Sequence, residues 1–542
     1  MQLKEALEVL EQIAFFLELK GENVFKINAF NNAVRNLSKY DVSLEEAFEK
    51  NIIQNTKGVG KTIQNVLEEL LKKGNSSLLK ELESEFPEGI LKLTQIRGLG
   101  AKKIKKLYEE LGISSIDELE QACIENKLLK IQGFGEKTQN SLLENIKKIK
   151  DYQGKILLHY ADEIAQSVLD EAKKSGIKKI EITGSLRLRS TVISNLEFLI
   201  SEEKSIDKFL QHFKAKKVET NIYQSEYKGV SLKFFVSKEE FFNYELFRTT
   251  GTDNFLKRVK FHEINQKTFK SEHQIFETLK LPYIPPQARE NDSLEIREYD
   301  FPELKDLKGL IHIHSNYSDG SNTIKEIVEF AQKNNYEYVL ICDHSKSAFY
   351  ANGLDEIRLR EQWEEIDNLN SQSKKVKILK GIECDILPDG SLDFDDKILR
   401  QFDCVIASIH SKFKMTKDEM TKRISSALKN KFVKILGHPT GRLLLSRDAY
   451  PLDLNEIINV ASQEGKSIEL NCNPHRLDLD WEFHQKAKSK GIKITISPDA
   501  HSFEDMSYVK FGIDMAIKGG LEKSDIVNCM NTEEFLKKFC NK

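Results

Sequence analysis

Histidine and carboxylate side chains recur at the ends of predicted strands between residues 312 and 501. Eight of the 12 histidines in the 542-residue chain fall in this segment. Imidazole and carboxylate ligands in such number suit Zn²⁺, Mn²⁺ or iron ions. His-x-His on one strand points both side chains to one face, where they can share an ion. The candidate ligands are His312, His314, Asp319, His344, Glu383, His410, His438, Asp499 and His501.

Seven short apolar segments that alternate with helical patterns must position these ligands. They cover residues 310–314, 338–342, 377–382, 405–409, 433–437, 467–471 and 493–497. Such alternation predicts a barrel-like or doubly wound α/β domain with its active site at the carboxyl ends of the strands. His475 and His484 lie off this pattern, and we expect them to be structural or surface residues.

A phrase with two glycines and a neighbouring basic residue appears three times in the first 150 residues, where apolar positions at three- and four-residue steps predict an all-helical region. A single Gly-x-Gly usually marks a helix cap, so the recurrence carries the interpretation. Such a turn lets the backbone approach a phosphate, and the next helix start offers N–H donors. We expect sequence-independent, salt-sensitive phosphate contacts. The residues are Gly58, Gly60, Lys61, Gly98, Gly100, Lys102, Gly133, Gly135 and Lys137.

Between these two regions the pattern changes to strand-like pieces such as 179–183 and 229–236, which predict an α+β domain. Four of the 10 prolines fall between residues 282 and 302 and indicate a stiff connection before a boundary near residue 300. We predict two helical domains (1–80 and 81–150), an α+β domain (151–240), a short helical region with the proline-rich linker (241–300) and the α/β domain (301–542).

Composition limits the classes of protein that fit. The 82 Lys and Arg against 85 Asp and Glu leave a formal net charge of −3, so no global basic field attracts a polyanion. No segment approaches 18 uncharged apolar residues, and charges interrupt the first residues, so neither a membrane partner nor a signal peptide is expected. Seven scattered cysteines, from Cys123 to Cys540 and without Cys-x-x-Cys, favour reduced thiols in the cytoplasm.

The glycine phrases resemble the helix-hairpin-helix domain of family X DNA polymerases, which holds DNA around gaps. Val66 stands at the position of that family's lyase lysine, so no lyase activity is predicted. Residues 184–200 and 231–233 resemble the family's nucleotidyltransferase palm, whose signature is Gly-Ser, then Asp-x-Asp and a third carboxylate on a later strand.

In this sequence Gly184 and Ser185 are kept, but the three carboxylate positions hold Asn195, Glu197 and Ser231. Two-metal phosphoryl transfer needs carboxylates to offset the repulsion between the two ions. The resemblance therefore implies a degenerate palm that binds DNA without polymerising it.

The histidine and carboxylate set resembles the PHP (polymerase and histidinol phosphatase) family over roughly residues 305 to 540, which implies a distorted (β/α)7 barrel holding two or three divalent ions. In that family's pattern, Glu383 bridges two ions and is catalytic, and Arg442 is a candidate phosphate clamp. The implied sets are His312, His314, Glu383 and Asp499 for one ion, Glu383, His410 and His438 for the second, and Asp319, His344 and His501 for the third.

The order of the domains resembles that of the bacterial family X polymerases with a PHP domain. It implies a cytoplasmic, monomeric, metal-dependent phosphoesterase, with Mn²⁺ or Zn²⁺ the first candidates, that acts as a 3′-to-5′ exonuclease or 3′-end processing enzyme on gapped or nicked DNA in repair. Three alternatives remain open: an active gap-filling polymerase with an exonuclease, a small-molecule phosphatase, and a non-catalytic DNA-binding adaptor.

Overall fold

The computed structural model describes residues 1–40, 42–202, 205–372 and 375–539. Cys540 lies outside the described residues. The chain divides into two compact units, Met1–Gln153 and Gly154–Lys542. The finer boundaries near residues 80, 240 and 300 remain predictions.

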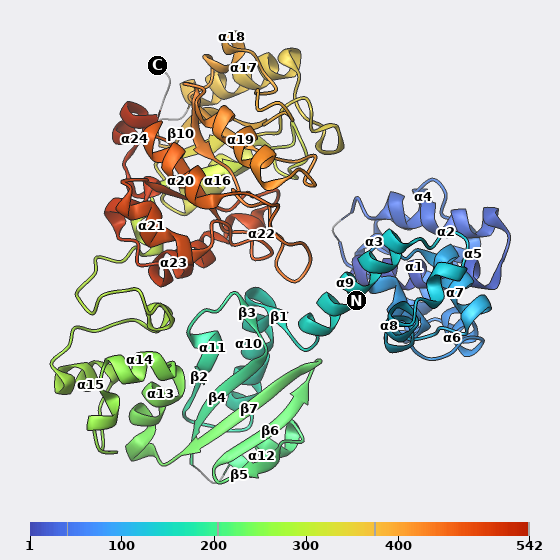
Figure 1. The fold of residues 1–542 in the computed structure, drawn as a ribbon, viewed down its shortest axis with the longest axis horizontal. Coiled ribbons are helices and arrows are strands. Elements are labelled where there is room, and N and C mark those ends of the chain that lie inside the picture. Colours follow the sequence, from blue (N-terminus) through green and yellow to red (C-terminus); the bar gives the residue numbers. More distant parts are fainter. Residues whose placement is uncertain (41, 203–204, 373–374, 540–542) are drawn as a thin grey trace. The chain divides into compact units, whose positions relative to one another are not determined.

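The first unit is helical throughout, as the apolar periodicity predicts (Figure 1). Leucine and isoleucine side chains from its helices form one core, which includes Leu10, Leu67 and Leu107. Helices α5, α7 and α9 each begin directly after a Gly-x-Gly phrase. The elements are α1 (Leu3–Lys20), α2 (Val24–Leu37), α3 (Leu44–Glu49), α4 (Ile52–Asn55), α5 (Lys61–Lys73), α6 (Ser77–Ser84), η1 (Ile90–Gln95), α7 (Ala101–Leu111), α8 (Ile116–Ile124), η2 (Lys127–Lys130) and α9 (Glu136–Tyr152).

The second unit begins with a five-stranded sheet in the order β2-β4-β7-β6-β5. Strands β4 and β7 are parallel neighbours, and the other pairs are antiparallel. Alternating buried residues on β7, such as Leu232 and Phe234, pack under the helices. The elements are β1 (Ile156–Leu157), α10 (Leu158–Lys174), β2 (Ile180–Thr183), α11 (Gly184–Arg187), β3 (Val192–Ile193), β4 (Asn195–Ser201), α12 (Ile206–His212), β5 (Lys216–Glu219), β6 (Ile222–Tyr227) and β7 (Val230–Ser237).

A helical segment follows, with α13 (Phe242–Thr250), α14 (Asp253–Arg258), α15 (Glu272–Leu279) and η5 (Pro286–Glu290) around a cluster of phenylalanines. Glu272 on α15 is buried and accepts hydrogen bonds from Arg187 and from Arg289, whose side chain is fully buried. Arg187 belongs to the Gly-Ser phrase after β2, so this ion-pair network fixes that phrase to the helical segment.

Seven parallel strands in the order β14-β13-β12-β11-β10-β9-β8 form the remainder of the unit. A parallel bridge between Ile313 and Ala500 links the two edges, so the sheet is a nearly closed barrel. Each strand overlaps its predicted segment, and the predicted distorted (β/α)7 barrel is confirmed. The strands are β8 (Gly309–Ile313), β9 (Tyr338–Ile341), β10 (Lys377–Asp385), β11 (Cys404–Ser408), β12 (Val433–Leu436), β13 (Ser467–Asn471) and β14 (Ile494–Ser497).

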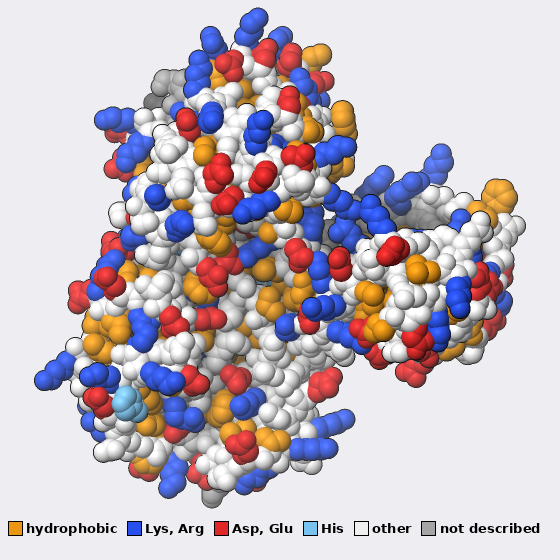
Figure 2. Space-filling model, in the orientation of Figure 1, with side chains coloured by type: hydrophobic (Ala, Val, Ile, Leu, Met, Phe, Trp, Pro, Cys, Tyr) orange, Lys and Arg blue, Asp and Glu red, His pale blue; other side chains and the backbone are white. Residues whose placement is uncertain are grey.

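Helices cover the barrel, with their apolar faces on the strands. They include α16 (Ile324–Lys333), α17 (Glu356–Gln372), α18 (Asp396–Leu399), α19 (Lys417–Leu428), α20 (Leu454–Gln463), α21 (His484–Ser489), α22 (Phe503–Met506), α23 (Val509–Lys518) and α24 (Thr532–Phe539). Acidic and basic side chains are interspersed over the face drawn in Figure 2. No helix in the described part of the chain is long and apolar enough to cross a membrane.

Candidate metal centre

The nine predicted ligands converge at the carboxyl ends of the barrel strands. His312, His314, Glu383 and Asp499 form one buried group whose ligand atoms lie within 4.8 Å of one another. In this group His314 Nε2 lies 3.0 Å from Asp499 Oδ1, and His312 Nε2 lies 3.5 Å from Glu383 Oε1. These distances leave room for one ion between the four side chains.

Glu383 also faces the second predicted set. Its Oε1 lies 3.2 Å from His410 Nε2 and 2.9 Å from His438 Nε2, and these two imidazole nitrogens are 3.2 Å apart. His344 Nδ1 lies 2.9 Å from Glu383 Oε2. The carboxylate of Glu383 therefore stands between two groups of imidazoles.

The third set gathers around Asp319. Its Oδ1 lies 3.3 Å from His501 Nε2, 3.6 Å from His344 Nε2 and 3.8 Å from His314 Nδ1. His314 thus faces both this group and the first one. His475 and His484 lie outside all of these groups; His484 is fully buried and contacts the Leu479 carbonyl oxygen at 3.3 Å.

Two of the ligands have unusual backbone conformations. His312 has φ +69° and Asp499 has φ +52°, in the left-handed region that non-glycine residues rarely adopt. At His312 the register of β8 against β9 shifts, as in a β-bulge that redirects a side chain. The surrounding hydrogen bonds hold these conformations, including His314 N–H to the Ala500 carbonyl at 2.9 Å. Residues held in such strained backbone conformations tend to lie at functional sites.

Carboxylates behind the ligands fix the orientation of their rings. Glu469 Oε2 lies 2.6 Å from His312 Nδ1, and Asp385 Oδ1 lies 3.1 Å from His410 Nδ1. Such partners set which ring nitrogen is free to bind a metal ion. The sequence reasoning missed both residues, although Glu469 lies on a predicted strand and Asp385 follows one.

The electrostatic environment suits cation binding. Burial alone would raise the pKa of Glu383, but the neighbouring His410 and His312 hold it well below the usual range. Burial, together with His501 and His344, lowers the pKa of His314 to about 3, so its ring is neutral. Burial would also lower the pKa of His410 and of His501, but Glu383 raises that of His410 to about 10 and Asp319 raises that of His501 to about 9, so a metal ion would displace a proton from each of these rings.

Buried ligand atoms without hydrogen bonds are a second reason to expect divalent ions at this site. His312 Nε2 and His314 Nδ1 are buried and have no hydrogen-bond partner within the described ranges, and Glu383 Oε2 accepts no hydrogen bond there although His344 Nδ1 lies 2.9 Å away. Unpaired buried polar atoms are costly, and a cation between them would remove that cost. All groups of three or more His, Cys, Asp or Glu side chains that could hold an ion, in the part of the chain that is described, lie in the barrel.

Arg442 is engaged by neighbouring groups of the same chain. Its guanidinium forms an ion pair with Asp480, and its Nε donates to the Arg476 carbonyl oxygen at 2.9 Å. Arg476, which the sequence reasoning missed, directs its own Nε to within 4.0 Å of Asp499 Oδ2. Arg442 therefore supports the loop that carries Arg476 toward the ligands.

The structure also brings together the residues of the predicted degenerate palm. Asn195 and Ser231 are direct partners across β4 and β7. Glu197 lies 3.8 Å from Lys233 Nζ and packs on Gly184, where a Cβ atom would come within 1.7 Å of Glu197 Oε2. Ser185 follows Gly184 in α11. Burial raises the pKa of Glu197, and Lys233 offsets part of that rise.

The three glycine phrases share one backbone geometry. Gly58, Gly98 and Gly133 have φ between +88° and +95°, which favours glycine. Gly60, Gly100 and Gly135 are the residues before α5, α7 and α9, and no side chain among the described residues caps these helices. A Cβ atom on these three glycines would meet nothing within 4 Å, so the space over the helix starts is open. Lys61, Lys102 and Lys137 are exposed beside them.

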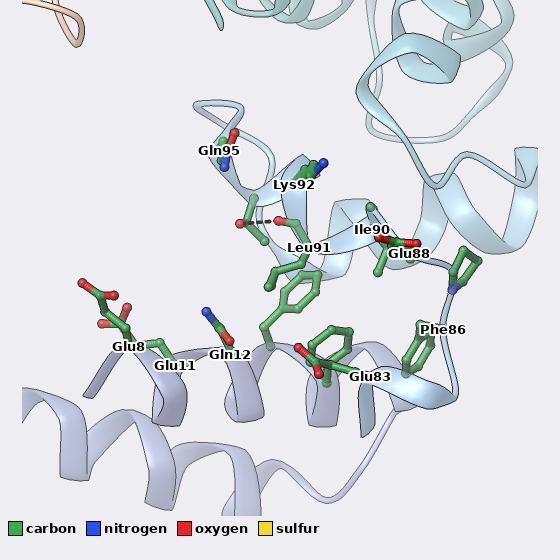
Figure 3. A pocket seen from close by; sticks show the side chains of 15 residues that line it. Glu8, Glu11, Gln12, Glu83, Phe86, Glu88, Ile90, Leu91, Lys92 and Gln95 are labelled. Carbon is green, nitrogen blue, oxygen red and sulfur yellow. Dashed lines mark hydrogen bonds between the residues drawn. The ribbon is translucent and has the colours of Figure 1, made fainter. Parts of the chain in front are cut away.

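A separate hollow of about 940 Å³ lies in the first unit, between α1, α6 and η1. Figure 3 shows Glu8, Glu11, Glu83 and Glu88 around it, with Lys92 as the one labelled basic side chain. This acidic rim would repel phosphates. Phosphate contacts in this unit are therefore better assigned to the hairpins.

Comparisons with known proteins agree with this arrangement. The sequence matches the helix-hairpin-helix domain family over residues 1–76, a SAM-like helix-hairpin-helix tandem over residues 90–148 and the PHP domain over residues 311–473. The fold and the cluster thus define a PHP-type barrel joined to hairpin domains.

One relative extends over the whole chain. It is the DNA polymerase/3′-5′ exonuclease PolX of Bacillus subtilis, 35% identical over 99% of this chain and 100% of that protein. Probable phosphatases of a Thermoanaerobacter species and of Acetivibrio thermocellus are 31% and 30% identical over 28% and 36% of this chain, and 64% and 79% of their own lengths. The chain belongs to the bacterial PolX family, whose members carry a PHP domain.

Proposed function

We propose that this protein is a DNA-binding, metal-dependent phosphodiesterase that removes nucleotides from 3′ ends during DNA repair. The observation that carries the proposal is the convergence of the nine predicted ligands in linked groups around Glu383 and Asp319, backed by Glu469 and Asp385. The name of the Bacillus subtilis relative includes a 3′-5′ exonuclease. We further propose that the protein acts in the cytoplasm as a monomer.

The ligand sets support two or three divalent ions, Mn²⁺ or Zn²⁺ first, with iron as a third candidate. Such ions acidify water and stabilise charge that develops on phosphoryl oxygens. Glu383, between two imidazole groups, would keep the ions at a fixed separation. Glu469 would hold the His312 ring in the orientation that directs Nε2 inward.

Two arginines divide the phosphate-binding role in this proposal. Arg476 would meet a phosphate oxygen, because its guanidinium already approaches the ligand Asp499. Arg442, the clamp suggested by the sequence, would act through Arg476 by fixing its backbone. Its own donors are engaged by Asp480 and by the carbonyl oxygens of Arg476 and Leu477.

The hairpins and the palm would hold the DNA. Contacts through backbone N–H groups and the lysines beside them position a duplex without reading its bases, so gapped, nicked or 3′-ended DNA of any sequence would bind. The palm would contribute to binding but not to synthesis, because Asn195 and Ser231 carry no charge and Glu197 faces Lys233.

An active polymerase is the second candidate function, because the name of the Bacillus subtilis relative also includes that activity. One experiment separates the two: a 5′-labelled gapped duplex with Mn²⁺, with and without dNTPs, for the wild type and a His312→Ala/His314→Ala variant. We expect shortening that the variant loses, and no extension. Extension by both proteins would overturn the proposed loss of polymerase activity.

A small-molecule phosphatase is a third candidate. The two probable phosphatases match only about a third of the chain, so they have no counterpart for most of it. Hydrolysis of phosphomonoesters such as histidinol phosphate, without shortening of DNA, would favour this alternative over the nuclease.

A further inference from the structure

Two aromatic side chains stand exposed beside the metal centre. Phe349 is 88% exposed and Tyr350 is 72% exposed. Both lie in the short helix η7 (Phe349–Ala351), in the segment that follows β9 and the ligand His344. The Tyr350 ring centroid lies 6.2 Å from the ring of His344 and 6.5 Å from that of His410. We name Phe349 and Tyr350 the aromatic ledge.

The loop that carries the ledge is held by hydrogen bonds along its length. Ser345 N–H donates to the Glu383 carbonyl oxygen at 3.1 Å, and Leu354 N–H donates to that of His344 at 2.8 Å. Ser347 N–H donates to Asp393 at 2.7 Å. Because these bonds fix the backbone, the exposure of the two rings is a feature of an ordered loop.

The core of the barrel does not use the two rings. The loop packs through Ala348 and Ala351, each only 1% exposed, while Phe349 and Tyr350 between them face solvent. Gly353 permits this turn, since a Cβ atom there would lie 2.0 Å from the Ser345 carbonyl oxygen. Two exposed adjacent aromatics that add nothing to the core, at the mouth of a charged cluster, are typical of a binding surface.

We propose that the aromatic ledge binds the unpaired nucleobase at the 3′ end of the DNA by stacking, and so selects frayed, mismatched or single-stranded ends. This inference rests on the proposed nuclease function. In a nucleotide the base is one sugar away from the phosphate. A phosphate held at the ligands would therefore have its base within reach of Tyr350, whose ring centroid lies 6.2 Å from that of His344.

Stacking explains the expected selectivity. Every nucleobase has an aromatic face, so a stacking surface tolerates any sequence. A paired base inside a duplex has its faces covered by its neighbours, whereas an unpaired terminal base can turn onto the ledge. A 3′ end that lacks its base, or a phosphate ester without a ring, gains nothing from these side chains.

The first measurement compares 5′-labelled oligonucleotides that end in a natural base or in a tetrahydrofuran abasic residue. For the wild type we expect a KM about tenfold lower for the natural end, within the range of one stacked base. A Phe349→Ala/Tyr350→Ala variant should bind both ends equally with kcat little changed, and Tyr350→Phe should keep the discrimination. Leu304→Ala/Ile357→Ala, which truncates two other exposed apolar side chains of the barrel region, is the matched control.

A second measurement does not depend on cleavage. An oligonucleotide with 2-aminopurine at its 3′ end should lose fluorescence when it binds the wild type and the control variant, and should keep it with the double alanine variant. Release of the tetrahydrofuran residue from the abasic oligonucleotide at saturating substrate reports the metal centre without a terminal base, and its rate should be equal in all three proteins.

The outcomes separate the two proposals. Quenching without shortening of DNA would contradict the nuclease and support the ledge. Shortening with equal KM for both ends and no quenching would overturn the ledge and leave the nuclease intact. Loss of tetrahydrofuran release at saturating substrate in the double variant would assign the two rings a structural role and also overturn the ledge.

Discussion

The barrel and the palm both gather polar side chains at strand ends, but they use them differently. In the barrel, the nine potential ligands gather around Glu383 and Asp319, and two further carboxylates contact the rings of His312 and His410. In the palm, Asn195 and Ser231 are uncharged, and the one carboxylate, Glu197, faces Lys233. The proposed loss of polymerase activity rests on this difference, because divalent cations need negatively charged ligands at the strand edge that would hold them.

The contrast extends to the arginines. Arg187, in the helix α11 that begins with the Gly-Ser phrase of the palm, donates hydrogen bonds to the buried carboxylate of Glu272, so it contributes to stability. Arg476 of the barrel points to the ligand Asp499. Polar groups of the palm are thus tied to other protein groups, while those of the barrel remain directed at a common centre.

The largest expected effect is on the free energy of unfolding, and it concerns the ion pairs of Glu272 with Arg187 and Arg289. Glu272→Gln leaves both Arg187 and the buried Arg289 without their anionic partner, and we expect a loss of about 3–5 kcal/mol in the free energy of unfolding of the second unit. Urea unfolding followed by the fluorescence of Trp363 and Trp481 measures this unit. Glu277→Gln, on the exposed face of α15, is the control. Equal stability of the two variants would mean that the network is dispensable.

The same network predicts a pH dependence. Burial would raise the pKa of Glu272, but Arg289 and Arg187 outweigh it and lower the pKa from 4.5 to about 2. A carboxyl with a lowered folded-state pKa stabilises the fold above its unfolded pKa, and this contribution is lost as the pH falls from about 4.5 toward 2. The stability difference between the wild type and Glu272→Gln should shrink over this interval. A constant difference would contradict the assignment.

The next effect concerns a carboxylate behind the ligands of the barrel. Glu469→Gln keeps the shape of the side chain but removes the charge that orients His312, and we expect nuclease activity or metal affinity to fall about 10- to 100-fold. Mn²⁺ titration of exonuclease rates measures the change, and Glu464→Gln, an exposed residue at the end of α20, should behave as wild type. A wild-type Mn²⁺ dependence in Glu469→Gln would contradict the role of Glu469 in orienting His312.

A smaller effect is expected when charge is restored to the palm. Asn195→Asp/Ser231→Asp places two carboxylates beside Glu197, and we expect binding of Mn²⁺–dNTP to tighten about tenfold, or roughly 1.4 kcal/mol. Fluorescent dNTP binding measures it, and Asn195→Ala/Ser231→Ala is the control. Unchanged binding of Mn²⁺–dNTP would mean that the number of carboxylates alone does not explain the difference between the palm and the barrel.

The smallest effect concerns one hairpin lysine. Lys61→Gln should reduce the slope of log affinity against log salt for duplex DNA by about 0.9, with a loss of a few fold in affinity at moderate salt. Lys72→Gln, on the same helix but paired with Glu68, should leave the slope unchanged. Equal slopes for both variants would contradict a phosphate contact at the first hairpin.

Much of the fold follows from local patterns in the sequence. The apolar segment at residues 338–342 predicts β9 because fully buried parallel strands are often continuously apolar. Residues 467–471, which form β13, instead alternate polar and apolar side chains. The ligand cluster is predictable because carboxyl ends of parallel strands meet at one end of a barrel. The hairpins repeat, so their shared geometry is visible in the chain itself.

Other features depend on contacts between distant segments and leave no local signal. The pairing of Glu197 with Lys233 joins two strands, and the contact of Glu469 with His312 joins residues 157 positions apart. The engagement of Arg442 by Asp480 likewise requires the folded loop. The sequence showed an arginine of the right type near the site but not which of two would face the ligands.

The loop after the palm's Gly-Ser phrase is joined directly to the barrel. Arg189 forms ion pairs with Asp162 and with Asp514 of α23, and the buried Lys518 donates to the Leu188 carbonyl oxygen at 2.8 Å. A barrel separated from the palm would expose the Lys518 ammonium and would leave Asp514 without Arg189. The palm and the barrel are therefore structurally interdependent, because each supplies partners for buried polar groups of the other.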